Sequence, residues 1–113
     1  MSVEKKIEKI AVFGEKKKLN KILKYVEAKE PELRAAAAKA LANIKVDESY
    51  NALTDLIRDQ DVAVRRQAVI SLGIFGRKAG AEHVRGVMSR PENAEFIADC
   101  QSAITAILNS NER

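Results

Sequence analysis

The sequence predicts an all-α protein, and within that class an α-solenoid of stacked helical hairpins. Three observations support this: an internal repeat of 31 residues, helix-type spacing of apolar residues inside each repeat, and a scarcity of tight-turn residues. Only two Pro and five Gly occur among 113 residues, and aromatic residues make up 4%. The core must therefore be built from Ala, Leu, Ile and Val, in a chain long enough for about one small domain.

The repeat is clearest in two stretches of sequence. RAAAAKALANI at 34–44 aligns with RRQAVISLGIF at 65–75, so that Leu41 falls on Leu72 at a shift of 31. Further copies occur at a shift of 62 toward the N-terminus and of 32 toward the C-terminus. A fixed period of this length indicates a repeat architecture. The predicted units are 1–29, 30–60, 61–91 and a C-terminal half-unit at 92–110 that caps the stack.

Each unit contains two helical patterns. In the first, small or apolar residues recur at i, i+4, i+7, i+8 and i+11, and in the second at i, i+3, i+6 and i+7, as one face of an α-helix requires. About seven helices are therefore expected, at 2–13, 16–28, 31–44, 47–58, 62–75, 79–89 and 94–109.

Capping residues support these boundaries. Asp61 precedes a helical run, as an N-cap should, and Asn93 is expected to play the same role for the last helix. Glu30 is followed by Pro31 at a first helical position, where Pro is well tolerated. The first helices of two units are expected to end at C′ glycines, namely Gly14 and Gly76.

A hairpin of some 31 residues cannot bury both faces alone, so its copies must stack. Close stacking is permitted by small residues at equivalent positions, namely Ala37, Ala68 and Cys100. In the alanine-rich helix we expect Ala37, Ala40 and Leu41 to pack, while Arg34 and Lys39 stay exposed to water.

The third unit carries a recognisable pattern, Asp-x-x-Val-Arg-x-x-Ala-x-x-x-Leu-Gly, formed by Asp61, Val64, Arg65, Ala68, Leu72 and Gly73. It resembles the short HEAT repeat of phycobilin lyase-type proteins. The second unit matches more loosely, with Ala42 in place of the Gly, and the fourth departs, with Ile97 where Arg is expected. The resemblance implies a HEAT-like αα-hairpin superhelix. Proteins of this kind are mostly binding scaffolds; some assist cofactor attachment, and more distant HEAT-like branches handle DNA.

Charge is unevenly distributed along the chain. Residues 1–29 contain nine Lys against four Glu, a net charge of +5 within a total of +4. The N-terminus is charged from residue 4 and lacks the apolar segment of a signal peptide, and no apolar run reaches the length of a membrane span. We therefore expect a cytoplasmic protein that does not enter a membrane.

The second helices of the units are expected to line a concave face that binds a partner. Its predicted contact residues are Lys17, Lys21, Lys24, Asp55, Arg58, His83 and Arg85. The favoured hypothesis is a non-catalytic scaffold that binds a protein. The alternative is a nucleic-acid-binding module that uses Lys17, Lys18, Lys21 and Lys24, although no aromatic residues alternate with these lysines to stack on bases. The lysines can equally be a solvated end surface, as terminal repeats require.

No catalytic or metal site is expected, and no cofactor. His83 and Cys100 are single residues of their kinds in different units, whereas zinc needs four clustered ligands. Cys100 replaces the Ala of other units and is expected to be a small buried hydrophobe. Arg34 and Arg65 recur at one repeat position and are expected to contact carboxylates between stacked units, with anion binding as the alternative.

The last helix carries one broad apolar stripe, made of Phe96, Ile97, Cys100, Ala103, Ile104, Ile107 and Leu108. If the whole stripe packs on the preceding units, the helix is a cap. If Ile97 or Leu108 is exposed, the edge is apolar and can dimerise or dock a partner helix. The expected state is a monomer or a weak dimer through this helix.

Overall fold

The computed structural model describes residues 1–111, in which every regular element is helical. This confirms the all-α prediction. Seven α-helices and one 3₁₀-helix follow one another in this part of the chain: α1 (Val3–Glu15), α2 (Leu19–Leu23), α3 (Pro31–Leu41), α4 (Asp47–Leu56), α5 (Val62–Phe75), α6 (Gly80–Met88), η1 (Pro91–Phe96) and α7 (Ile97–Leu108).

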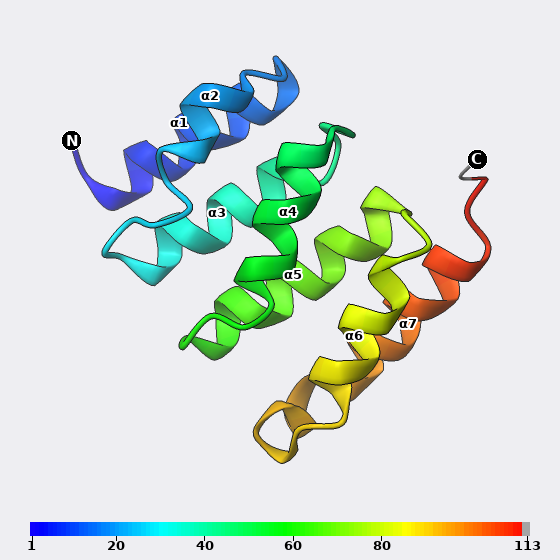
Figure 1. The fold of residues 1–113 in the computed structure, drawn as a ribbon. Coiled ribbons are helices and arrows are strands. Elements are labelled where there is room, and N and C mark those ends of the chain that lie inside the picture. Colours follow the sequence, from blue (N-terminus) through cyan, green and yellow to red (C-terminus); the bar gives the residue numbers. More distant parts are fainter. Residues whose placement is uncertain (112–113) are drawn as a thin grey trace.

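The helices form two layers. In the first layer α1, α3, α5 and α7 lie side by side in chain order, and α2, α4 and α6 lie on one side of them as a second layer (Figure 1). Each second-layer helix packs on first-layer neighbours, whereas successive second-layer helices make few close contacts with one another. The result is a slab of 37 × 33 × 17 Å, in which α1 and α7 lie at opposite ends of the first layer. Stacking in sequence order is the arrangement of an α-solenoid.

The core lies between the two layers and is aliphatic. Its fully buried large side chains come from both layers in equivalent places, among them Ile22, Leu41, Leu53, Ile57, Leu72, Val84 and Ile107. The predicted packing positions Ala37, Ala68 and Cys100 are fully buried as well. Each Å² of apolar surface buried between the layers contributes about 25 cal/mol, so this core is the main source of stability.

First-layer helices approach one another closely through glycine. A Cβ atom added to Gly73 of α5 would lie 3.0 Å from the Cα of Ala103 in α7. A Cβ added to Gly14 of α1 would lie 3.0 Å from the Cβ of Ala40 in α3. Few real Cβ atoms come this near, so a larger residue at either position would push the neighbouring helix away by a few tenths of an ångström.

The predicted end of the first helix is wrong. Gly14 does not occupy a C′ position, because α1 continues to Glu15 and Gly14 is needed for the contact with Ala40. The chain instead turns at Lys17, whose φ is +53°, and the N–H of Lys18 donates to the carbonyl of Phe13 at 2.8 Å. Gly76, by contrast, ends α5 with φ +81°, which confirms its predicted C′ role.

The second predicted helix, at 16–28, is much shorter than expected. Lys16 to Lys18 form the turn after α1, so α2 begins at Leu19, and it ends at Leu23. Beyond it the chain continues in tighter i+3 turns, in which Tyr25 N–H donates to Ile22 and Ala28 N–H to Tyr25. The other predicted boundaries are within about three residues, and α5 spans its predicted 62–75.

The last helix begins differently from the prediction. Residues 91–96 form the 3₁₀-helix η1, and α7 begins at Ile97. Asn93 is therefore not an N-cap; it is a buried residue within η1. Four members of the predicted apolar stripe are buried: Phe96, Cys100, Ala103 and Ile107. Ile97 and Leu108 are 37% and 53% exposed, so the helix both caps the stack and leaves an apolar edge.

Replacing Leu41 or Leu72 by Ala should lower the free energy of unfolding by about 2–5 kcal/mol, because each side chain is almost fully buried and truncation leaves a cavity. Leu108→Ala, at an exposed position of α7, should change it by less than about 0.5 kcal/mol. Urea unfolding measures all three. Losses near zero at both buried leucines would contradict the packing register.

Candidate functional site

A polar network joins the edges of successive helical pairs and begins at Arg34. Its Nε and Nη2 donate to the two carboxylate oxygens of Asp59 at 2.8 and 3.0 Å. Nη1 donates to the carbonyls of Ala28 and Lys29 at 2.7 and 3.1 Å. The side chain is 8% exposed, so the expectation that Arg34 stays in water is wrong. The guanidinium is instead a buried, bidentate link between α3 and the loop before α5.

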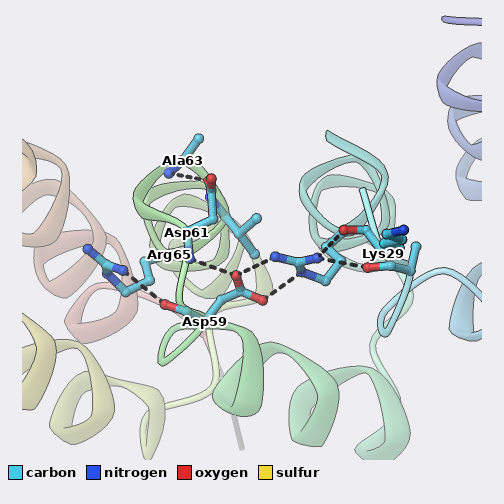
Figure 2. A network of polar contacts seen from close by, with 8 residues as sticks. Lys29, Asp59, Asp61, Ala63 and Arg65 are labelled. Atoms are coloured by element: carbon cyan, nitrogen blue, oxygen red, sulfur yellow. Dashed lines mark hydrogen bonds and ion pairs between the residues drawn. The ribbon is translucent and has the colours of Figure 1, made fainter. Parts of the chain in front are cut away.

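The network continues through the turn that begins α5 (Figure 2). Asp59 also accepts from the N–H of Asp61 at 2.9 Å. Asp61 in turn accepts from the N–H groups of Ala63 and Val64, which confirms its predicted N-cap role. One carboxylate therefore fixes Arg34 and the helix start together.

Arg65 extends the network to the next helical pair without a carboxylate. Its Nη1 donates to the Asp59 carbonyl at 2.9 Å, and its Nε donates to Asn93 Oδ1 at 2.8 Å. The amide of Asn93 donates to the carbonyl of Val87 at 2.9 Å. Arg34 thus contacts a carboxylate, as expected, but Asp59 belongs to the same predicted unit, 30–60, and not to a neighbouring one. At Arg65 an amide and a backbone carbonyl take the carboxylate's place.

The seven predicted contact residues all lie in or beside the second layer. We call the exposed side of α2, α4, α6 and their adjoining loops the second-layer face. Six are exposed and His83 is half-buried. No hydrogen bond or ion pair within residues 1–111 joins two of them. They are Lys17 in the turn after α1, Lys21 and Lys24 at α2, Asp55 and Arg58 at α4, and His83 and Arg85 on α6.

Several of these side chains are held by their own helix or its neighbour. Arg58 donates to the carbonyl of Thr54 at 2.8 Å, and Arg85 pairs with Glu82 one turn earlier. The ring of His83 lies edge-on to the buried ring of Tyr50, with centroids 6.1 Å apart. The face therefore presents positioned side chains from two helices.

A cleft between the ends of α4 and α6 was not predicted. It has a volume of about 380 Å³, and arginines dominate its lining. The full lining is Ile57, Arg58, Asp59, Arg65, Gly86, Val87, Arg90, Glu92 and Asn93. One signal could have identified it in the sequence, since Arg58 and Arg90 each directly follow the C-cap residue of a second-layer helix.

The chain matches a family profile described as HEAT repeats over residues 13–105. It belongs to the HEAT-repeat family. The match does not separate the phycobilin lyase-type class from other HEAT repeats, so that part of the resemblance stays a prediction. No curated protein and no solved structure matches the chain significantly.

This HEAT-repeat protein keeps its one cysteine in the core. Cys100 is fully buried, and burial, together with the nearby Asp99 carboxylate, raises the pKa of its thiol. This confirms the predicted small hydrophobe. Within residues 1–111 no group of three or more His, Cys, Asp and Glu side chains is placed to hold a metal ion. None of the described helices is long and apolar enough to span a membrane.

The Arg34–Asp59 pair makes the stability of the HEAT repeats depend on pH. Burial of Asp59 opposes ionisation. The hydrogen bonds from Arg34 and Asp61 and the positive charges of Arg34 and Arg65 outweigh it, so the pKa of this carboxyl is lowered from 3.8. A lowered pKa adds stability that is present above the ordinary value and is lost as pH falls below it through the folded value.

Asp59→Asn should lower the free energy of unfolding at pH 7 by about 3 kcal/mol, because it leaves Arg34 buried without a counter-charge. The free energy of unfolding of the variant should also fall less than that of the parent protein as the pH is lowered from about 5 to 2, because the Asp59 carboxyl no longer titrates. Urea unfolding across this range measures both effects. The exposed Asp55→Asn variant is the control. An unchanged pH profile in Asp59→Asn would contradict the role given to the pair.

Proposed function

We propose that this protein is a non-catalytic scaffold or adaptor that binds another protein through its second-layer face. The observation that carries the proposal is a difference in packing between the two layers. First-layer helices pack on one another through small residues, while α2, α4 and α6 make few contacts among themselves and expose charged side chains. HEAT repeats are commonly protein-interaction scaffolds.

The mechanism is recognition by a preformed surface. Because each second-layer helix packs on first-layer helices, its backbone keeps its position when a partner binds, and little backbone entropy is lost. An extended segment lying across α2, α4 and α6 would meet Lys21, Asp55, Arg58 and Arg85 in turn. Such a surface favours specificity through charge pattern.

Reversing two charges on this face should abolish partner capture. The variant is Asp55→Lys with Arg85→Glu, which leaves the net charge unchanged. Tagged protein would be used for affinity capture from an extract of the source cells, and captured proteins compared by quantitative mass spectrometry. We expect specific partners to fall at least about tenfold, since charge-assisted contacts of 1.5–3 kcal/mol are lost.

The control is the same net-neutral exchange on the first layer, Glu32→Lys with Lys39→Glu on α3, where both side chains are exposed. It should retain the partners. Loss of capture in the control and retention in the second-layer variant would contradict the proposal and move the interface to the first layer.

The second candidate function is nucleic-acid binding by the basic end. It is favoured by one observation: none of the nine Lys side chains of residues 1–29 makes an ion pair or hydrogen bond within the described chain. Two of them lie beside one aromatic ring, with the Nζ atoms of Lys9 and Lys21 at 6.0 and 5.7 Å from the centroid of Phe13. Unpaired cations of this density attract polyanions.

Labelled DNA and RNA oligonucleotides test this candidate by fluorescence anisotropy. Nucleic-acid binding predicts micromolar affinity at about 50 mM salt, a steep loss at about 200 mM, and no binding when Lys17, Lys18, Lys21 and Lys24 are all Glu. A variant with Lys39→Glu and Lys45→Glu should bind nearly normally. Absence of binding at low salt would exclude the candidate.

A further inference from the structure

Gly86 of the second layer is required neither by a close helix contact nor by its backbone conformation. Gly14 and Gly73 are required by close helix contacts, and Gly76 by its positive φ. A Cβ atom on Gly86, in contrast, would meet nothing within 4 Å, although Gly86 lies inside α6, where glycine weakens a helix. Gly86 lines the cleft between α4 and α6. Its missing side chain keeps one wall of that cleft open.

Three guanidinium groups line the same cleft and come from three different elements. Arg58 and Arg90 directly follow the C-caps of α4 and α6. Arg65 belongs to α5 and is held from both sides, by the Asn93 side chain and by the Asp59 carbonyl. The cleft thus combines a fixed central arginine with two exposed arginines at the helix ends.

Two of these three guanidinium groups make no ion pair within the described chain. Neither Arg58 nor Arg65 has a carboxylate within ion-pair distance. Asp59 also lines the cleft, but both of its oxygens accept from Arg34. Arg90 pairs with Glu92 at 3.5 Å. Three arginines thus face two carboxylates in the lining, and one of these carboxylates already has Arg34 as its partner. The cleft therefore has an excess of positive charge and free N–H donors.

We propose that this cleft is a carboxylate-binding site that receives an acidic side chain of a protein partner. The inference rests on the proposed function, because it assumes that the partner lies on the second-layer face. Arginine forks match a carboxylate in charge and geometry, and the apolar side chains of Ile57 and Val87 lower the dielectric around the contact.

The lining favours a peptide over a nucleic acid. No aromatic residue lines the cleft to stack on a base. A single carboxylate can instead lie between the arginines, while its peptide backbone runs past Gly86. An acidic residue within an extended segment is therefore the partner chemistry that fits.

The test uses a fluorescein-labelled decaglutamate peptide and anisotropy at about 50 mM salt. Gly86→Leu fills the cleft without changing any charge, and it should weaken binding at least about tenfold while thermal stability is kept or raised. Ala79→Leu, at the other end of α6, is its control. Arg58→Gln with Arg90→Gln should weaken binding by a similar factor. Lys21→Gln with Lys24→Gln, an equal change in charge outside the cleft, should weaken it by less than about threefold.

Unchanged binding in Gly86→Leu would overturn the site, and so would equal losses in the arginine and lysine variants, which indicate unspecific attraction. A peptide that does not bind would overturn it too. The capture experiment separates this inference from the proposed function. If partner capture depends on Asp55 and Arg85 but decaglutamate binds Gly86→Leu as tightly as the parent protein, only the carboxylate site is contradicted. If decaglutamate binds in the cleft but the Asp55→Lys, Arg85→Glu variant captures partners normally, the scaffold proposal is contradicted.

Discussion

The close approach of neighbouring first-layer helices is the constraint on which the rest of the structure depends. A hairpin of this repeat cannot cover both of its faces, so it is stable only against its neighbours. Where α1 meets α3 and α5 meets α7, a glycine faces an alanine so closely that a further carbon atom would push the helices apart. This spacing sets the distance between successive hairpins, and with it the places where second-layer helices can pack.

The same constraint explains why polar residues gather at the edges of the stack. Loops between hairpins carry carbonyl groups that no helix satisfies, and Arg34 and Arg65 donate to them from equivalent positions. The two arginines differ in their side-chain partners, Asp59 in one case and Asn93 in the other. Because Asn93 carries no charge, Arg65 makes no ion pair with its side-chain partner, although its charge helps to lower the pKa of Asp59. Arg65 therefore both links successive helical pairs and adds a positive charge to the cleft on the second-layer face.

Much of the fold could be predicted because repeat period and helix spacing are properties of sequence. The span of α5, the N-cap Asp61 and the burial of Cys100 follow from them. Gly14 could not be assigned correctly, since a glycine at a helix end and a glycine at a helix contact look alike in sequence. The burial of Arg34 depends on Asp59, 25 residues away, and the cleft depends on loops whose paths no periodicity specifies. The predicted contact residues share a face because they come from equivalent helices of successive repeats.

Hydrogen–deuterium exchange on the complex with a captured partner tests the central claim most directly, because it reports which helices the partner covers. Binding by the second-layer face predicts added protection in α4 and α6, strongest near Arg58 and Gly86, with α3 and α5 nearly unchanged. Protection confined to the exposed side of the first layer, with α4 and α6 exchanging as in the free protein, would contradict it.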